Sequence, residues 1–479
     1  MRHMRIKLIK PAIRAGTGLV LPNTAQLQDV ALPLLAALTP DDHSVTIVDE
    51  SFGPDDGDDA IDLVGISVLT DMALRSYQIA DHYRSRGVTV VMGGIHPTMV
   101  PDEVAEHCDA VVLQEGDRAW GQLLRDAEDG HLRRFYQAEM MPRLEGLPIP
   151  RRDLYPKPVH WHPAPFSVGI EASRGCPYDC EFCSVLKTRG HTYRMRPVDE
   201  IIEEIQAIDC EHLVFVDDNM ALDRRASRQL FAAMIPLKRR WVAEGNVALA
   251  EDPELLRLMK RAGCVGLLVG FETVKRGTMR TMKKLSRLKL DHAEAVRRFH
   301  GEGIAVMGAF VFGLDDDTPA VFDQTLEFAV NEKLDFAQFR ELVPYPGTPL
   351  YERLESEGRL LDPKWWLDPN RDFRDATPTF RPRGMSPQEL VDGLVLMSKE
   401  FYSFHSILKR FPGIAPRQRS GLGITLFFVI NWVLSRRYRD SHGITVRNVT
   451  GLSEVALGAA PARLCDRDRR RGSRFGGGS

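Results

Sequence analysis

The chain has 479 residues, of which 43% are hydrophobic and 27% charged, and its formal net charge is -3. This length is too great for one ordinary core, so two or three domains are expected. The charge balance gives no reason to expect a nucleic-acid partner, which would need a basic surplus. The first eleven residues lack the long apolar run of a signal peptide. Seven cysteines are an odd number, which argues against a disulfide framework and for a reducing, cytoplasmic location.

Residues 1–140 alternate short apolar runs with helical patterns, which predicts an α/β domain with a parallel, doubly wound Rossmann-like sheet. The expected strands are residues 5–11, 44–50, 62–69, 88–94 and 110–116. Ligands of such sheets bind outside the carboxyl ends of the strands. The loops there offer Ser67, Thr70, Gly93, Gly94, His96, Glu115 and Gly116 as candidate contacts. No G-x-G-x-x-G motif follows the first strand, so a nicotinamide site is unsupported.

Cys176, Cys180 and Cys183 lie in one eight-residue window with C-x3-C-x2-C spacing. Such a loop can bind zinc or an iron–sulfur cluster. A structural zinc site needs four protein ligands, and His191 would have to serve alone as the fourth. Three thiolates on a [4Fe-4S] cluster instead leave one iron open to bind a substrate molecule. The spacing therefore favours the cluster, with zinc as the alternative.

Six expected strands and five expected helices alternate over residues 161–362, which predicts a partial (βα)6 TIM-type barrel with its site at the strand carboxyl ends. The expected strands are residues 166–173, 212–219, 242–250, 265–273, 305–314 and 335–346, and the expected helices are 197–208, 224–237, 252–263, 290–303 and 318–333. In the helix over 252–263, Asp252 is the expected N-cap. Its expected buried stripe is Leu255, Leu258, Met259 and Ala262.

The remaining segments are a linker over residues 141–160, a helical region over 363–440 and a basic, glycine-rich tail over 441–479 that is expected to be disordered. Ser386 and Glu389 predict a capping box at the start of a helix. The apolar stretch 421–434 falls short of the roughly 20 residues that a membrane span needs. It predicts a buried helix, with an interfacial segment as the alternative.

The first domain resembles the cobalamin-binding domain that precedes radical S-adenosylmethionine (SAM) cores. This resemblance rests on DLVGISVLTDMA, VVMGGIHPTMVPDE and VVLQEGDRAW. Gln114 and Asp117 depart from the glycine and glutamate that are common there. No Asp-x-His-x-x-Gly motif is present, and Asp41-Asp42-His43 comes nearest to one. If cobalamin binds, the resemblance implies the base-off form without a histidine ligand.

The cysteine trio resembles that of the radical SAM superfamily, with an aromatic residue directly before the third cysteine. The resemblance implies that the cluster is held by the three cysteines and that SAM contacts Phe182, Asp218, Glu272 and Gly313. It also implies that cobalamin contacts the seven loop residues of the first domain. Two alternatives stay open, that the acidic residues cap helices, as expected for Asp317, and that His96 orders its loop without touching cobalamin. No catalytic acid or base is identified.

The resemblance implies that SAM is cleaved to a 5'-deoxyadenosyl radical, which takes hydrogen from an inert carbon, and that methylcobalamin supplies a methyl group. The leading hypothesis is a cobalamin-dependent radical SAM C-methyltransferase acting on a small natural product or lipid. The alternatives are an oxidative cyclase or ring-rearranging enzyme with the same cofactors and, third, a non-catalytic cobalamin or cluster sensor. The expected partners are a flavodoxin- or ferredoxin-type electron donor and, as an alternative for the helical region, a membrane surface.

Overall fold

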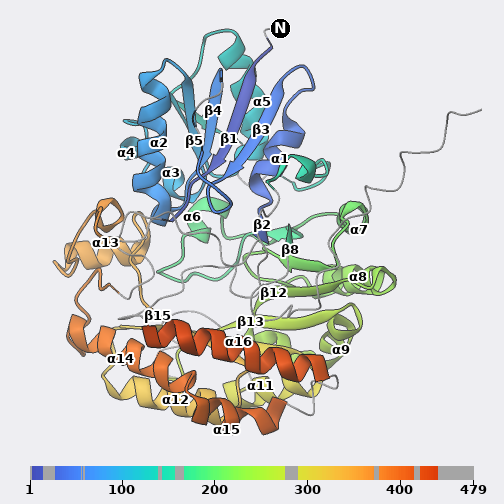
Figure 1. The fold of residues 1–479 in the computed structure, drawn as a ribbon, viewed down its shortest axis with the longest axis vertical. Helices are drawn as coiled ribbons and strands as arrows, with labels where there is room; N and C mark the ends of the chain where they lie inside the picture. The colour runs from blue at the N-terminus through green and yellow to red at the C-terminus, as the bar shows by residue number, and fades with distance from the viewer. Residues whose placement is uncertain are drawn as a thin grey trace, which may run out of the picture.

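A computed structural model of the protein describes residues 3–13, 27–55, 57, 60–138, 143–156, 167–275, 290–371, 377–414 and 421–440 (Figure 1). It contains a first unit with a six-stranded sheet and a second unit with a seven-stranded sheet. In the view of Figure 1 the first unit lies above the second, and the C-terminal helices lie below the second sheet. The predicted α/β fold class is confirmed.

All strand pairs of the first sheet are parallel, and the strand order is β3-β1-β4-β5-β6-β7. The strands are β1 (Arg5–Lys10), β3 (Ser44–Asp49), β4 (Leu63–Ser67), β5 (Thr89–Gly93), β6 (Ala110–Leu113) and β7 (Phe135–Gln137). The sequence predicted all of them except β7. The order is that of a doubly wound sheet, whose ligands bind outside the carboxyl ends of its strands.

Helices cover both faces of the first sheet. They are α1 (Ala31–Leu38), α2 (Ala73–Ser85) and α5 (Gly116–Glu128), with the short α3 (Ile95–Met99) and α4 (Pro101–Val104) in the loops. Val90 and Met92 pack with α2, whereas Val91 between them packs with α1 and α5. This alternation follows from the two-residue period of a strand, and it explains why both faces of these strands are apolar.

The second sheet has the order β15-β14-β13-β12-β11-β8-β2, and its strand pairs are parallel too. Its strands are β2 (Leu27–Gln28), β8 (Ser167–Ile170), β11 (His212–Phe215), β12 (Arg240–Asn246), β13 (Cys264–Glu272), β14 (Ala305–Phe312) and β15 (Phe336–Glu341). The six predicted strands are confirmed. The edge strand β2 was not predicted, because two residues carry no readable alternation, and it comes from the part of the chain assigned to the first domain.

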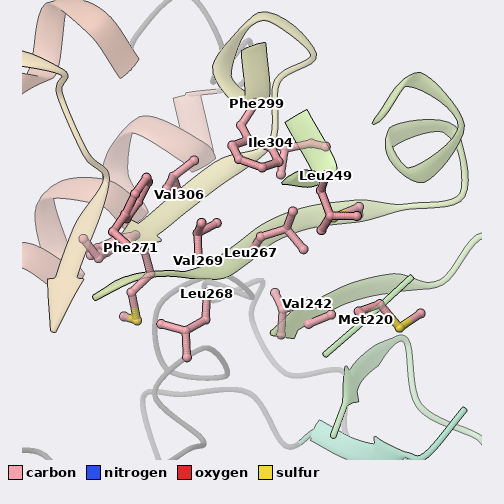
Figure 2. Close-up of a cluster of buried hydrophobic side chains, with 14 of the residues drawn as sticks. Met220, Val242, Leu249, Leu267, Leu268, Val269, Phe271, Phe299, Ile304 and Val306 are labelled. Atoms are coloured by element: carbon pink, nitrogen blue, oxygen red, sulfur yellow. The ribbon is translucent and has the colours of Figure 1, made fainter. Parts of the chain in front are cut away.

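The helices of the second unit are α7 (Val198–Ala207), α8 (Arg224–Met234), α9 (Pro253–Arg261), α11 (His292–Gly301) and α12 (Ala320–Asn331). Figure 2 shows the packing behind β13, where Leu267 and Val269 lie on the side of Phe299, whereas Leu268 lies on the opposite side. The expected N-cap of α9 is confirmed, since the carboxylate of Asp252 accepts from the backbone N–H of Leu255 at 3.0 Å.

The apolar stripe of α9 differs slightly from the predicted one. Leu255, Leu256 and Met259 are fully buried, whereas Leu258 is only partly buried. The expected cap at Asp317 is wrong. Its carboxylate turns back and accepts from the backbone N–H groups of Gly313 and Leu314, both at 3.1 Å, so it closes the loop before the helix.

The C-terminal region contains α13 (Pro349–Ser356), α14 (Pro387–Phe401), α15 (Phe404–Ile414) and α16 (Gly421–Asp440). The capping box of Ser386 and Glu389 is confirmed. Residues 421–434 form a helix as expected, but it is buried on one face only, through Phe427, Asn431 and Leu434. Val429, Trp432 and Val433 are 44–53% exposed. Among the described helices none is long and apolar enough to span a bilayer, and the expected tail over 441–479 lies outside the described residues.

Candidate functional site

The cysteine loop lies between two short antiparallel strands. β9 (Ser173–Arg174) precedes it and pairs with β10 (Arg194–Met195), and α6 (Val185–Arg189) begins directly after it. Gly175 between β9 and the first cysteine has φ 87°, and a Cβ there would overlap the carbonyl oxygen of Thr192. Only glycine fits both the left-handed conformation and this close approach. The start of the loop is therefore fixed by its backbone.

Side chains from neighbouring strand ends hold this loop. The carboxylate of Asp218 accepts from the backbone N–H of Gly175 at 2.7 Å. The amide of Asn219 donates to the sulfur of Cys176 at 3.8 Å, and Asn246 at the end of β12 donates to the oxygen of Asn219 at 2.8 Å. Hydrogen bonds to the sulfurs are one way in which a protein tunes an iron–sulfur cluster. Asn246 was not predicted as a site residue, because the expected strand over 242–250 placed it in the middle of a strand, whereas β12 ends at Asn246.

The arrangement of the three cysteines fits a cluster better than a single metal ion. Among the described residues only Asp42, His43 and Glu128 bring three ligand atoms within 4.8 Å of one another. The three sulfurs are not that close, as expected if each thiolate binds a different iron. Zinc would also need a fourth ligand, and His191, the one considered, is exposed.

The group around His43 is held together by a contact between His43 and Glu128. The Nδ1 atom of His43 accepts from the backbone N–H of Met4 at 3.2 Å. Its Nε2 atom lies 3.4 Å from a carboxylate oxygen of Glu128. His43 directly precedes β3, at the amino end of the strands. It therefore lies at the edge of the sheet away from the candidate cobalamin loops.

Beneath the cysteine loop lies a buried carboxyl group, Asp217. Ser173 donates its hydroxyl hydrogen to this carboxyl group, and the backbone N–H of Ala172 donates to it at 3.2 Å. Burial raises the pKa of Asp217 to about 7, and the two hydrogen bonds oppose this shift only in part. The Asp217–Asp218–Asn219 run thus supports the loop from three directions, through Ser173, Gly175 and Cys176.

The other candidate SAM contacts also lie at strand ends. Glu272 ends β13 at a register shift and has φ 63°, which is rare outside glycine and is typical of strained functional positions. Gly313 follows β14 with φ 95°, and a Cβ there would lie 3.1 Å from the ring of Phe380. Phe182 packs against the small apolar cluster that contains Phe380, so the structure brings it close to Gly313.

The inner face of the second sheet is partly polar. By register Asn246 lies beside Gly270, and Gly270 beside Ala309, which in turn lies beside Gln338. Half-buried polar side chains on the same face are Glu244, Gln338 and Arg340. Their alternation with buried apolar neighbours distinguishes this face from the one that packs against the helices.

The candidate cobalamin contacts are brought together at the carboxyl ends of β4, β5 and β6. Ser67 pairs with Gly93 in register. Gly94 has φ 113°, and a Cβ there would lie 2.9 Å from the carbonyl oxygen of Val68. The close packing of two loops is therefore the first reason why glycine stands at these positions. In the same place the hydroxyl oxygen of Thr70 is buried and has no hydrogen-bond partner in the described part of the chain.

His96 is fully buried and faces the protein. Its Nε2 lies 3.0 Å from the hydroxyl of Tyr77 and 3.6 Å from Glu103. Burial lowers the pKa of His96, although Glu103 opposes this. The carboxylate of Glu103 also accepts from the indole of Trp366 at 2.8 Å, so this cluster joins the first unit to the segment after α13.

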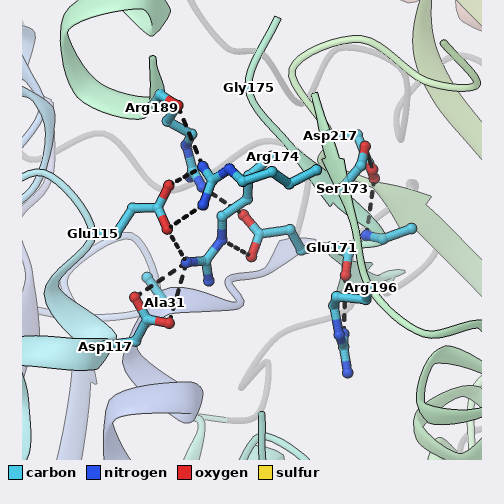
Figure 3. Close-up of polar contacts among 12 residues, drawn as sticks. Ala31, Glu115, Asp117, Glu171, Ser173, Arg174, Gly175, Arg189, Arg196 and Asp217 are labelled. Atoms are coloured by element: carbon cyan, nitrogen blue, oxygen red, sulfur yellow. Dashed lines mark hydrogen bonds and ion pairs between the residues drawn. The ribbon is translucent and has the colours of Figure 1, made fainter. Parts of the chain in front are cut away.

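Glu115 and Gly116 lie at the start of α5, and the carboxylate of Glu115 points to the second unit (Figure 3). It pairs with Arg174 at 3.0 Å and also with Arg194. Although burial opposes ionisation, these two guanidinium groups hold the pKa of Glu115 below its ordinary value. The left-handed φ of 58° at Gln114 just before it explains why glycine is common there.

The chain matches two families of known function. Residues 18–124 match the B12 binding domain, and residues 170–329 match the radical SAM superfamily. Residues 348–418, which include α13 and α14, match a domain of unknown function.

Three relatives and one solved structure are similar over most of the chain. Bacteriochlorophyllide d C-12(1)-methyltransferase of Chlorobaculum tepidum is 28% identical over 85% of this chain and 89% of its own. Hopanoid C-2 methylase of Rhodopseudomonas palustris is 27% identical over 74% and 71%. Anaerobic magnesium-protoporphyrin IX monomethyl ester cyclase of Cereibacter sphaeroides is 25% identical over 71% and 59%. The radical SAM methyltransferase TsrM of Kitasatospora setae, solved with cobalamin and a [4Fe-4S] cluster, has a TM-score of 0.63 at 17% identity and covers 92% of this chain and 100% of its own.

Proposed function

We propose that this chain, which belongs to the cobalamin-dependent radical SAM enzymes, is a C-methyltransferase that acts on an unactivated carbon of a small molecule. Its cofactors are a [4Fe-4S] cluster, SAM and cobalamin. The observation that carries the proposal is the direct contact between the two candidate cofactor loops, since Glu115 beside the cobalamin loops is ion-paired with Arg174, two residues before Cys176. Because the loops adjoin, the cofactors they would hold share one space.

The residues of this chain have distinct roles in the proposal. Cys176, Cys180 and Cys183 hold the cluster, while Asp218 and Asn219 fix the backbone and one sulfur of their loop. When bound, the cofactors supply one-electron cleavage of SAM and a transferable methyl group. The protein's task is to orient the substrate and to exclude water and oxygen.

We assign Phe182, Asp218, Glu272 and Gly313 to the SAM site. The strained backbone of Glu272 supports this assignment. The position of Asp218, Glu272 and Gly313 at the carboxyl ends of barrel strands supports it too. Asp218 contacts the cluster loop directly, since its carboxylate accepts from the backbone N–H of Gly175. The polar inner face with Glu244, Gln338 and Arg340 is the proposed side for the substrate.

We assign the cobalamin contacts to the loops after β4, β5 and β6, with base-off binding and no histidine ligand. The buried hydroxyl of Thr70 supports a ligand there. His96 is enclosed by protein and Glu115 is held by arginines, so both act through the loops rather than as direct contacts. His43 lies at the amino ends of the strands, opposite the candidate cobalamin loops, so it is not proposed as a ligand of the cobalt.

The substrate is proposed to be a natural product or a lipid, because relatives are named for bacteriochlorophyllide d and a hopanoid. The second candidate is an oxidative cyclase or ring-rearranging enzyme with the same cofactors, which the similarity to a cyclase favours. Anaerobic incubation of reconstituted enzyme with a substrate panel separates the two. A methyltransferase forms a product heavier by one CH2 and S-adenosylhomocysteine as well as 5'-deoxyadenosine. A product without added mass, and no S-adenosylhomocysteine, would contradict methyl transfer.

Two partner proposals and a proposed location complete this function. Cluster reduction needs an external one-electron donor of flavodoxin or ferredoxin type. A cytoplasmic location fits the thiol chemistry, since none of the six cysteines in the described ranges forms a disulfide.

The apolar outer face of α16, defined by Val429, Trp432 and Val433, is the proposed contact with an anionic bilayer surface, since Arg436 stacks over Trp432 at 4.7 Å. Flotation with phosphatidylglycerol vesicles should fall in Trp432→Asp, and unchanged flotation would contradict the contact.

A further inference from the structure

The two units are joined by a buried group of ion pairs centred on Arg174 (Figure 3). Its Nη1 atom lies 3.0 Å from Glu115 and 3.1 Å from Asp117, both in the first unit. Its Nε atom lies 2.7 Å from Glu171 in its own unit. The side chains of Arg174, Glu115 and Asp117 are only 5–7% exposed. One guanidinium group therefore contacts carboxylates from both units away from water.

These ion pairs lie between the two cofactor loops. Glu115 and Asp117 stand at the start of α5, directly after the last candidate cobalamin loop. Arg174 ends β9, and the next residue, Gly175, is bonded to Asp218 at 2.7 Å. A displacement of the guanidinium group would thus move the beginning of the cysteine loop relative to the cobalamin loops.

Further arginines make the arrangement rigid. Arg194, the β10 partner of Arg174, pairs with the same carboxylate of Glu115. Arg189 at the end of α6 pairs with the second oxygen of Glu171 at 2.9 Å. Buried ion pairs add little net stability, because desolvation offsets the attraction, but they can specify one geometry. The planar fork of arginine suits this use, since its donors point in fixed directions.

We propose that Arg174 is a positioning residue that fixes the separation between the cobalamin loops and the cysteine loop. In this role it keeps SAM cleavage and methyl transfer directed at the same substrate carbon. The inference rests on the proposed function and adds a specific residue to it. A misplacement of about 1 Å at a reacting centre can cost about 100-fold in rate, so loss of Arg174 should slow methyl transfer far more than SAM cleavage.

The first test compares product ratios in the holoenzyme. In Arg174→Gln, 5'-deoxyadenosine formation should stay within about 3-fold of wild type, while the ratio of 5'-deoxyadenosine to methylated product rises at least about 10-fold. Arg261→Gln, an exposed arginine of α9, is the control and should leave the ratio unchanged. A parallel fall of both products would overturn the proposal, because Arg174 would then act on the cluster loop alone.

The second test does not depend on turnover. Pulsed EPR of the holoenzyme measures the distance between cob(II)alamin and the reduced cluster, and Arg174→Gln should broaden this distance distribution. Hydrogen exchange of the cofactor-free protein should show faster exchange over residues 114–118 and 174–176 in the variant. An unchanged distance and unchanged exchange would overturn the role of Arg174.

A conservative variant guards against misfolding. Arg174→Lys keeps the charge, but a single nitrogen cannot reach Glu115, Asp117 and Glu171 together. It should give an intermediate product ratio and an intermediate distance distribution, whereas wild-type values in both would overturn the proposal. If wild-type enzyme forms no methylated product with any substrate, the proposed function fails, while distance and exchange still decide the role of Arg174.

Discussion

The amide of Asn219 donates a hydrogen bond to the sulfur of Cys176 at 3.8 Å, and Asn246 in turn donates to Asn219. This chain of amides runs from the end of β12 to the first cysteine of the loop. Because Asn246 donates to the oxygen of Asn219, it leaves the nitrogen of Asn219 directed at the sulfur. The relationship therefore gives Asn219 a definite chemical task, which is to stabilise negative charge on that sulfur.

Replacement of Asn219 by alanine should lower the reduction potential of the cluster. The reduced cluster carries one more negative charge, which an N–H···S hydrogen bond stabilises. The midpoint from an EPR-monitored redox titration should therefore be more negative than in wild type, and SAM cleavage should be slower. Asn331→Ala, at an exposed position of α12, serves as the control and should keep the wild-type midpoint. An equal or higher midpoint in Asn219→Ala would contradict the role.

Removal of the three cysteines should abolish cluster binding. In Cys176→Ala, Cys180→Ala and Cys183→Ala the broad visible absorption of the cluster and all SAM cleavage should disappear, because each thiolate holds one iron. Cys210→Ala is the matched control, since this half-buried cysteine bonds the carbonyl oxygen of His212 and lies apart from the loop. It should keep wild-type iron content. A triple variant that still cleaves SAM would refute the assignment.

Gly175→Ala should disrupt the loop without touching a ligand. The backbone at Gly175 has φ 87°, and the new Cβ would overlap the carbonyl oxygen of Thr192. Such strain costs on the order of 1–3 kcal/mol, and bound iron per chain should fall. Gly121→Ala in α5 is the comparison, because its Cβ would meet its nearest neighbour, Arg125, at an ordinary 3.7 Å. It should stabilise the helix by up to about 1 kcal/mol.

Replacement of His96 should change stability but not the cobalt. The side chain is buried against Tyr77 and is turned away from solvent. His96→Ala should reduce the free energy of unfolding by about 1–3 kcal/mol, because the hydroxyl of Tyr77 loses a buried partner. The absorption and EPR spectra of bound cobalamin should match those of wild type. A change in the axial ligand signature would show that His96 reaches the cobalt.

The sequence predicted the repeating parts of the fold well. The Val- and Ile-rich strands, such as β4 and β5, and the capped helix α9 were expected at nearly their observed bounds, and the start of α14 was expected at its capping box, because each carries a local signal in apolar spacing or capping residues. β2 escaped prediction because its partner, β8, lies about 140 residues away and its two residues have no period of their own. The exposed outer face of α16 was not expected, because the apolar composition of a helix does not tell which of its faces packs against a neighbour.

The sequence predicted which loops form the candidate site, but it did not predict which side chains contact one another there. The spacing alone predicted the three cysteines of the loop as ligands. The position at strand ends indicated Asp218 and Glu272 as site residues. No local pattern could show that Glu115 faces Arg174, since this contact joins residues of different units. The same holds for Asp317, whose carboxylate turned back to Gly313 instead of capping the next helix.

Glu103 should make stability sensitive to acid. Burial opposes its ionisation, but hydrogen bonds from His96, Lys364, Trp366 and Tyr77 prevail and lower its pKa to about 2. Its stabilising contribution is therefore complete above the unfolded pKa of about 4.3 and is lost as the pH falls toward 2. Glu103→Gln should lower the free energy of unfolding by about 1–2 kcal/mol at pH 7, and the difference from wild type should shrink between pH 4 and 2.

Urea unfolding at pH 7 and pH 3 measures this difference. Glu106→Gln removes an exposed carboxylate close by in the sequence and should leave the free energy of unfolding within about 0.5 kcal/mol of wild type at both pH values. A pH-independent difference between Glu103→Gln and wild type would mean that packing, and not the ionised carboxylate, joins residues 364–366 to the first unit.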